Sequence, residues 1–340
     1  MTESKNHNSP RRQTQSYLRD LFSRRGVAPR HRFGQNFLID LNIHDLIAEG
    51  ADVGPGDVVL EIGPGAGAMT SLMASKGAAV VAVDIDPAMV ALTTEATEGL
   101  PNVRVFQADA LKGKHTINPV LIDNVRSGLA AAPGRRFKLV SNLPYNIATP
   151  ILTNLLVHPD ADIRPERMVV TIQLELAERL RADPQGSDYG ALSILVQALA
   201  DVELLRTLPP HVFWPRPKVE SAVVRITPNA EKRALIGDIP WFQTVVRQVF
   251  TQRRKNLRRV LHSFWRHELT KESVDEMLNS LGLAGMVRAE ALNVEEWIAL
   301  TVALKARLGD AATTAKVEVD DEEGEDEADS DEDEAEGDDD

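Results

Sequence analysis

The sequence predicts an α/β protein with a doubly wound, Rossmann-like parallel sheet followed by a small all-helical C-terminal domain. Two patterns support this fold class. From residue 58 onward, short apolar runs alternate with stretches of helical composition, as in successive strand–helix–strand units. After Pro228 the chain keeps a helical periodicity and shows no strand-like run. We therefore expect a Rossmann-like domain over residues 29–228 and a helical domain over residues 229–309.

The strands of the predicted sheet are short apolar runs, as expected for parallel strands buried on both faces. In chain order they are Val58–Ile62, Ala79–Ile85, Val103–Gln107, Phe137–Ser141 and Met168–Leu174. Two segments of helical composition, Met69–Lys76 and Ala88–Glu98, separate the first three strands. Two later runs, Ala200–Leu205 and Ser221–Thr227, are expected to complete the sheet as an antiparallel edge.

Three helices are predicted in the second domain, at Trp241–Trp265, Ser273–Leu281 and Val294–Leu308. The first of them has an apolar face, and the segment from residue 247 to 267 contains seven basic residues and no acidic one. On a continuous helix, residues 254 and 258 stack, as do 255 and 259, which would produce a basic stripe. Such a stripe is suited to phosphate contacts, although an ordinary solvated helix face has the same composition.

Composition excludes several classes of protein. Cysteine is absent from the 340 residues, which excludes disulfides, thiolate nucleophiles and iron–sulfur clusters and fits a reducing cytoplasm. No apolar run is long enough to span a membrane, and the N-terminal segment lacks the apolar core of a secretory signal. The eight histidines are scattered without ligand spacing, so no metal is expected.

The two ends of the chain carry opposite charge. Residues 1–28 are expected to form a flexible basic arm, although the spacing of Leu18, Leu21 and Phe22 also permits a short amphipathic helix. Residues 310–340 are expected to be a disordered acidic tail. Residues 318–340 contain 17 of the 51 acidic side chains, so the rest of the chain, with all 38 Lys and Arg, has a net charge of +4. The tail either solubilises the protein or competes with RNA for the basic stripe.

A glycine-rich turn follows the first predicted strand directly. Glu61-Ile62 runs into Gly63-Pro64-Gly65-Ala66-Gly67, and a helical stretch comes next. Glycines at such a turn allow a ligand to approach the backbone closely, although a tight turn without a ligand has the same pattern. Asp84 ends the next strand, where a carboxylate can accept hydrogen bonds from a ribose. Asp109 follows the third strand and is suited to an adenine amino group or, alternatively, to capping a helix.

The tetrapeptide Asn142-Leu143-Pro144-Tyr145 follows the fourth predicted strand. The Asn142 amide oxygen and the Leu143 carbonyl are acceptors, which together can hold the two hydrogens of an exocyclic amino group. Pro144 fixes the direction of the chain, and Tyr145 offers a flat face on which a base can stack. The sequence therefore predicts a site that presents an amino nitrogen to an electrophile, unless this segment is only a strand that ends in a proline turn.

These motifs, in this order, resemble those of the ribosomal RNA adenine N6,N6-dimethyltransferases, most closely the KsgA type. The resemblance runs from about Arg30 into the helical domain. Besides the Glu61–Gly67 turn, it rests on the segments RFGQNFL (32–38), NLPYNIATP (142–150), YGALS (189–193), FWPRPKVESAVVR (213–225) and FTQRRKNLRRVL (250–261).

The resemblance implies S-adenosylmethionine as methyl donor and two adjacent adenosines near the 3′ end of small-subunit ribosomal RNA as target. Carried over by position, the donor would be contacted by Asn36, Leu38, Gly63, Gly65, Asp84, Asp109 and Asn142. The family usually has Glu where this chain has Asp84. This shorter side chain puts the affinity for S-adenosylmethionine in question. The adenosine would be flipped out of the RNA, with Tyr145 stacked on one face and Phe213 on the other.

The resemblance also implies a pre-30S or 30S particle as partner and a monomeric enzyme that acts late in subunit assembly. Side chains expected to contact RNA phosphates are Arg216, Lys218, Arg253, Arg254, Lys255, Arg258 and Arg259. Alternatives are a non-catalytic ribosome-assembly factor, a large-subunit rRNA adenine methylase, a DNA adenine methyltransferase and, more remotely, a Rossmann oxidoreductase. An assembly factor would need the basic residues but neither Asn142 nor Tyr145. DNA adenine methyltransferases usually carry Pro in place of Leu143.

Overall fold

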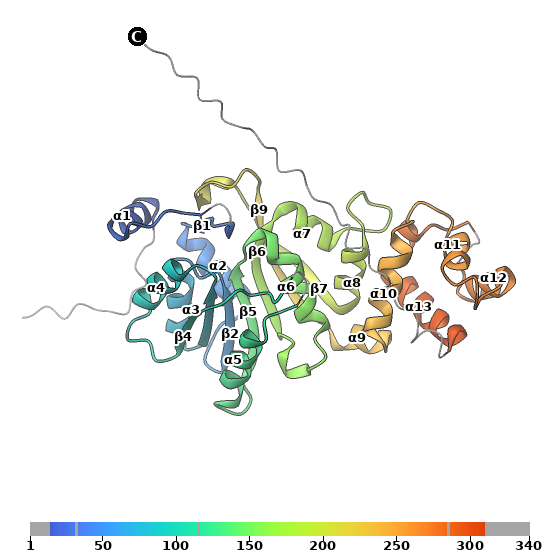
Figure 1. The fold of residues 1–340 in the computed structure, drawn as a ribbon, viewed down its shortest axis with the longest axis horizontal. Coiled ribbons are helices and arrows are strands. Elements are labelled where there is room, and N and C mark those ends of the chain that lie inside the picture. Colours follow the sequence, from blue (N-terminus) through green and yellow to red (C-terminus); the bar gives the residue numbers. More distant parts are fainter. Residues whose placement is uncertain (1–13, 31–32, 114–115, 284–285, 310–340) are drawn as a thin grey trace, which may run out of the picture.

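A computed structural model describes residues 14–30, 33–113, 116–283 and 286–309 of the chain (Figure 1). Its main sheet has seven strands in the order β4-β3-β2-β5-β6-β9-β7, and a separate two-stranded sheet pairs β1 with β8. The strands are β1 Phe37–Leu38, β2 Asp57–Ile62, β3 Ala79–Asp84, β4 Val103–Gln107, β5 Arg136–Asn142, β6 Arg167–Gln173, β7 Ala200–Leu208, β8 Phe213–Trp214 and β9 Ser221–Pro228.

The helices of the first part of the chain cover both faces of the sheet. They are α1 Gln15–Arg25, α2 Leu41–Gly50, α3 Ala68–Ser75, α4 Pro87–Ala96, α5 Pro119–Ala130, α6 Tyr145–Val157, α7 Leu174–Arg181 and α8 Ala191–Leu199. The C-terminal region contains α9 Ala230–Ile236, α10 Ile239–Phe250, α11 Leu257–Phe264, α12 Lys271–Ser280 and α13 Val294–Leu308. The predicted fold class is confirmed: a doubly wound α/β sheet precedes a helical C-terminal region.

The sheet is parallel from β4 to β6, and its edge is antiparallel. All five predicted parallel strands are present, and they pair in parallel with their neighbours. β9 pairs antiparallel with both β6 and β7, so the prediction of an antiparallel edge is confirmed. Because the parallel strands end at the same edge of the sheet, the segments that follow β2, β3, β4 and β5 lie together there.

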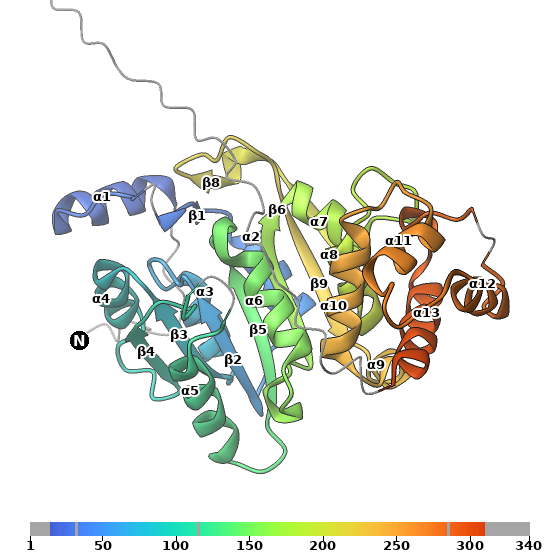
Figure 2. The same cartoon turned by 45° about the vertical axis from the view of Figure 1, so that its right-hand side comes forward.

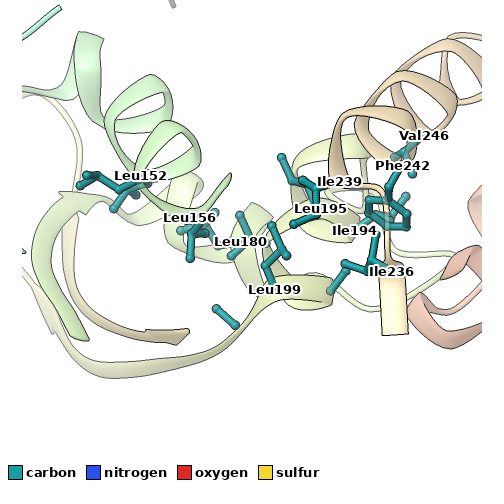
Figure 3. Close-up of a cluster of buried hydrophobic side chains, with 14 of the residues drawn as sticks. Leu152, Leu156, Leu180, Ile194, Leu195, Leu199, Ile236, Ile239, Phe242 and Val246 are labelled. Carbon is teal, nitrogen blue, oxygen red and sulfur yellow. The ribbon is translucent and has the colours of Figure 1, made fainter. Parts of the chain in front are cut away.

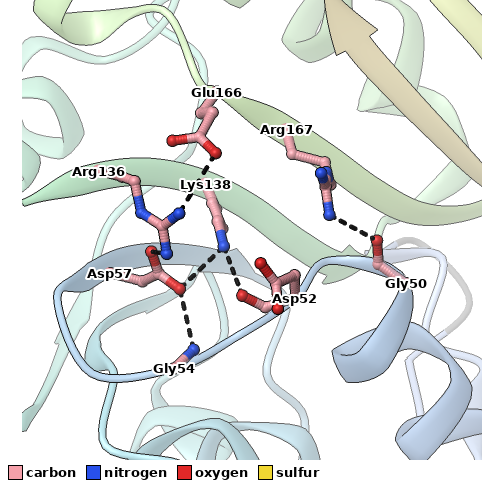
Figure 4. Close-up of polar contacts among 8 residues, drawn as sticks. All are labelled: Gly50, Asp52, Gly54, Asp57, Arg136, Lys138, Glu166 and Arg167. Atoms are coloured by element: carbon pink, nitrogen blue, oxygen red, sulfur yellow. Dashed lines mark hydrogen bonds and ion pairs between the residues drawn. The ribbon is translucent and has the colours of Figure 1, made fainter.

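A buried ion pair joins β2 and β5 at the opposite edge of the sheet, where these strands begin (Figure 4). Lys138 is fully buried, and its Nζ lies 2.9 Å from a carboxylate oxygen of Asp57. The other Asp57 oxygen lies 2.9 Å from the Arg136 guanidinium, and the Gly54 amide also donates to Asp57. Removing either partner of this pair would leave an uncompensated buried charge, so the pair holds β2 and β5 together at their start.

The described part of the N-terminal arm is a packed helix, which corrects the expectation of a flexible arm for residues 15–25. Thr14 caps α1 by accepting from the Tyr17 amide, and Gly26 ends it in the left-handed conformation. Leu18 and Phe22 are buried, and the Phe22 ring meets Phe37 of β1 edge to face at 5.2 Å. Figure 2 shows α1 beside β1 and near α4. The apolar face of α1 thus packs on the molecule; residues 1–13 lie outside the described residues.

The single helix predicted at Trp241–Trp265 is wrong, because the chain turns between α10 and α11. The Arg253 amide donates to Phe250 O and the Lys255 amide to Gln252 O, each three residues back, which ends α10 in tight turns. The Asn256 side chain then accepts from the Arg259 amide and caps α11. Two shorter helices therefore replace the continuous basic stripe.

One apolar core joins the sheet to the C-terminal helices (Figure 3). On the sheet side it includes Leu156 of α6 and Leu180 of α7, and α8 contributes Leu195 and Leu199. From the C-terminal region it includes Ile236, Ile239, Phe242 and Val246, all of them buried. The helices of residues 229–309 therefore pack against α8 as an extension of the core of the sheet domain.

Candidate active site

A cavity of about 280 Å³ opens at the carboxyl ends of the parallel strands. It is the place where ligands bind in open α/β sheets. Most of the predicted donor-binding and catalytic residues line it: Asn36, Leu38, Gly63, Gly65, Asp84, Asp109, Asn142, Leu143, Pro144 and Tyr145. Residues from β1, β2, β3, β4 and β5 that are far apart in the sequence thus meet around one cavity.

The glycine-rich turn forms the centre of the cavity wall, between β2 and α3. Gly63, Gly65 and Gly67 all have positive φ, at 74°, 60° and 80°, which side chains other than glycine rarely adopt. A Cβ on Gly65 would lie 2.8 Å from the Phe37 ring, and one on Gly63 would lie 3.4 Å from Pro144. Glycine is therefore needed both for the conformation of the turn and for its close packing.

Asp84 and Asp109 present carboxylates from β3 and from the segment after β4. Asp84 is only 8% exposed, and burial raises its pKa from 3.8 to about 6, although the Asp86 amide donates to it at 2.9 Å. Asp109 accepts from the Leu111 amide at 2.9 Å, and the Asn118 side chain donates to its backbone carbonyl. Both side chains line the cavity and have further oxygen lone pairs with which to accept from a ligand.

The cavity is also lined by two titratable side chains that the sequence analysis did not identify as site residues. Glu61 of β2 is 2% exposed and accepts from the Thr70 hydroxyl at 2.6 Å. Burial raises the pKa of Glu61 from 4.5 to about 8, so the carboxyl is mostly protonated at neutral pH. His44 of α2 is 5% exposed, and burial lowers its pKa to about 4, so it is neutral. In the sequence, the only indication of these two residues was a polar side chain among apolar ones: Glu61 within an apolar strand and His44 on the apolar face of a helix.

Asn142 lies at the end of β5, and the residue just before β1 orients its side-chain amide. Its Nδ2 donates to the Asn36 backbone carbonyl at 2.8 Å, which assigns the donor half of the amide and leaves Oδ1 as the acceptor. The Leu143 side chain is buried, and its backbone amide donates to Thr171 O. The Asn142 amide oxygen is therefore left as an acceptor for a ligand.

The hydroxyl of Tyr145 is held by a residue far away in the sequence. It shares a hydrogen bond of 2.7 Å with the Ser221 hydroxyl, and Ser221 is fully buried at the start of β9. Burial raises the pKa of Tyr145, so the phenol stays protonated. This bond fixes the Tyr145 ring at the cavity wall. Nothing in the sequence pointed to Ser221, because the contact joins two segments 76 residues apart.

Phe213 does not line the cavity, so its predicted stacking role is wrong for this structure. Its side chain is 1% exposed and packs with Leu38, Ile43 and other buried residues on the α2 and α3 side of the sheet. The strand pairing of β8 with β1 turns this ring into the core. Phe33 and Phe37 are the aromatic residues that line the cavity together with Tyr145.

The predicted RNA-contacting residues lie on two separate surfaces. Arg216 and Lys218 are exposed on the connection between β8 and β9. Arg253, Arg254 and Lys255 are exposed on the turn between α10 and α11, which we call the basic turn. The remaining two lie on α11: Arg259 is exposed, whereas Arg258 forms an ion pair with Asp275 at 2.6 Å. The structure therefore does not bring the seven into one stripe.

Within the described residues, the acidic, histidine and cysteine side chains form no group that could hold a metal ion. No helix among them has the length and apolar character to cross a membrane.

Comparison with known proteins agrees with this site. A family model for the ribosomal RNA adenine dimethylases matches residues 27–302. The chain is 38% identical to ribosomal RNA small subunit methyltransferase A of Moorella thermoacetica over 288 residues, 84% of this chain and 96% of that protein. It is 36% identical to the protein of the same name from Geobacillus kaustophilus over 298 residues, 87% of this chain and 98% of that protein.

Solved structures share the fold. A dimethyladenosine transferase from Plasmodium falciparum aligns with a TM-score of 0.66 and 24% identity, covering 79% of this chain and 97% of that one. The 23S rRNA methyltransferase ErmE aligns with a TM-score of 0.57 and 27% identity, covering 79% of this chain and all of that one. With the family model matched over most of its length and its motifs gathered around one cavity, this chain belongs to the ribosomal RNA adenine dimethylase family of S-adenosylmethionine-dependent methyltransferases.

Proposed function

We propose that this enzyme methylates N6 of two adjacent adenosines near the 3′ end of small-subunit ribosomal RNA. The product is N6,N6-dimethyladenosine, formed in a pre-30S or 30S particle late in subunit assembly. The observation that carries this proposal is the orientation of the Asn142 side chain. Its Nδ2 donates to the Asn36 carbonyl, which leaves Oδ1 as an acceptor in the cavity that Tyr145 also lines. The names of the bacterial relatives support the choice of the small subunit.

The donor would bind along the carboxyl edge of the sheet. Asp109 and Asp84 suit the adenine and the ribose, because they follow adjacent strands and line the same cavity. Gly63 and Gly65 allow the ligand to approach the backbone between β2 and α3. Asn36, Leu38 and Asn142 line the remaining part, where the amino-acid end and the methyl group would lie. We expect no metal to take part, because the positive charge on sulfur would activate the methyl group and the neutral thioether S-adenosylhomocysteine would be the leaving group.

Catalysis would consist mainly of positioning. The target adenosine leaves the RNA stack and lies against the Tyr145 ring, with Phe33 as a second aromatic side chain in the cavity. Asn142 Oδ1 and the Leu143 carbonyl accept from the amino hydrogens, which directs the nitrogen lone pair at the methyl carbon. S-adenosylmethionine supplies this carbon as an electrophile, so a C–N bond forms as the C–S bond breaks, and the N6 proton then leaves to solvent.

RNA would be held by exposed cations on two separate surfaces. Arg216 and Lys218, on the segment between β8 and β9, would contact phosphates close to the flipped base. The basic turn and Arg259 would contact a more distant part of the particle, and phosphate contacts of this kind weaken with salt. We expect the enzyme to act as a cytoplasmic monomer.

The proposal is tested by incubating the protein with isotope-labelled S-adenosylmethionine and small subunits that lack the modification. Large subunits serve as a parallel substrate. Nuclease digestion and mass spectrometry should find dimethyladenosine near the 3′ end of the small-subunit RNA, and the Asn142→Ala and Tyr145→Ala variants should lose it. Label in the large subunit instead would assign the ErmE-like substrate. Tight binding without label in either subunit would point to a non-catalytic assembly factor and overturn the proposal.

A further inference from the structure

His44 is a buried polar side chain in the cavity wall whose role the reaction described above leaves open. It lies on α2, on the same buried face as Ile43 and Ile47, and is 5% exposed. The ring lines the cavity together with Asn36, Leu38 and Glu61. Its Nδ1 is fully buried and has no hydrogen-bond partner among the described residues. Buried polar atoms are nearly always paired, so an unpaired ring nitrogen on a side chain that lines the cavity calls for a partner such as water or a ligand.

The position of His44 identifies the part of the donor that it would meet, given the proposed function. The order β4-β3-β2-β5 places Asp109, Asp84, Gly63 and Asn142 along one edge of the sheet. With the adenosine part at the first two and the methyl group at Asn142, the amino-acid end is left beside Asn36. That part of the cavity is lined by β1 and by α2, the helix that carries His44.

The protonation state of the His44 ring determines what it can offer a ligand. Burial keeps His44 neutral, so one ring nitrogen carries a hydrogen and can donate. Glu61, which lines the same cavity, has a pKa raised to about 8 and is mostly protonated at neutral pH. Asp45 and Asp40 are the charged groups that act on His44, and both raise its pKa against the larger effect of burial.

We propose that His44 donates a hydrogen bond to the carboxylate at the amino-acid end of S-adenosylmethionine. In the free protein the unpaired buried nitrogen destabilises the fold. Binding of S-adenosylmethionine would give the ring a hydrogen-bond partner. His44 is thus a cofactor-binding residue that adds to the affinity for the donor and takes no part in moving the methyl group.

The test compares two ligands that differ in the amino-acid end. S-adenosylhomocysteine carries this end, whereas 5′-methylthioadenosine lacks it. Calorimetry should show that His44→Leu weakens binding of S-adenosylhomocysteine by about tenfold, as expected for one hydrogen bond to a charged group, and leaves binding of 5′-methylthioadenosine unchanged. His44→Gln keeps a donor and should recover part of the affinity.

The thermal stability of the ligand-free variants separates this role from a structural one. Removing an unpaired buried nitrogen should leave the melting temperature of His44→Leu equal to that of the wild type or higher. An equal loss of affinity for both ligands, or a lower melting temperature with unchanged binding of S-adenosylhomocysteine, would overturn the inference. Ligand binding is measured without RNA, so failure of wild-type methylation would count against the proposed function and leave this result standing.

Discussion

The two residues expected to hold the target base are each oriented by one hydrogen bond from a distant segment. Asn36 accepts from the Asn142 amide, and Ser221 bonds to the Tyr145 hydroxyl. Neither Asn36 nor Ser221 has to touch the base to affect the reaction. Because catalysis here depends on positioning, a small loss of orientation should reduce the rate of methyl transfer more than it reduces ligand affinity.

Ser221→Ala should therefore slow methyl transfer by roughly three- to tenfold, the effect of losing one hydrogen bond of about 1 kcal/mol. Tyr145→Phe removes the other partner of the same bond and should have a similar effect. The double variant should be no slower than either single one, which single-turnover kinetics can measure. Affinity for S-adenosylhomocysteine should stay constant. Additive effects of the two substitutions would contradict the assignment.

Glu61 should make the stability of the free protein depend on pH. Its folded-state pKa of about 8 lies above the ordinary value of 4.5, so the folded protein holds the proton more tightly than the unfolded chain. This contribution is complete below the ordinary pKa and is lost as the pH rises through about 8.

Relative to Glu61→Gln, we expect the wild type to lose stability between about pH 5 and pH 9, by at most about 5 kcal/mol for a shift of this size. Thermal melts across this range measure the difference. The surface variant Glu49→Gln, which removes an exposed carboxyl of α2, should follow the wild type. Parallel curves for wild type and Glu61→Gln would show that Glu61 is not protonated in the fold.

Local sequence could identify most residues of the site but not their long-range partners. Gly63, Asp84 and Asn142 follow apolar runs directly, so their place at the carboxyl edge could be deduced from the order of strands. The roles of His44 and Ser221 depend on contacts between segments that are far apart in the chain. Phe213 was misassigned for the same reason, because only the pairing of β8 with β1 shows that its ring lies in the core.

At the level of elements, long apolar runs were predictable and short or interrupted ones were not. Five parallel strands stood out because each is rich in apolar residues, although Glu61, Arg104 and Lys138 interrupt three of them. β1 and β8 have two residues each, too few to show a period. The break between α10 and α11 was hidden because residues 251–256 are polar and fit a solvated helix face equally well. Only the backbone turn and the Asn256 cap distinguish the two structures.

The basic turn has a measurable consequence for RNA binding. Replacing Arg253, Arg254 and Lys255 with Ala should reduce the dependence of log affinity on log salt by roughly 2, for about 0.7 to 0.9 per lost phosphate contact. Salt titrations of small-subunit binding measure this slope. Arg258→Ala is the matched control, because Asp275 already neutralises this side chain. An equal change in slope for the control would contradict a special role of the turn.

On the scale of the whole molecule, charge is divided between a basic folded part and an acidic tail. The tail, residues 310–340, lies outside the described residues, so its effect is argued from its charge. If the tail competes with RNA, deleting residues 310–340 should raise affinity for nonspecific RNA at low salt and have little effect at high salt, where charges are screened. Filter binding at two salt concentrations measures this, and unchanged affinity at low salt would assign the tail to solubility alone.

The shared core of Figure 3 limits how this protein can be divided or recombined. A fragment consisting of residues 229–309 would expose Ile236, Phe242 and Val246 to water, and the remaining piece would expose the matching face of α8. Neither fragment is expected to be soluble alone. An exchange of RNA specificity with a relative would therefore have to transplant α8 along with the C-terminal helices, so that both sides of the packed surface come from one parent.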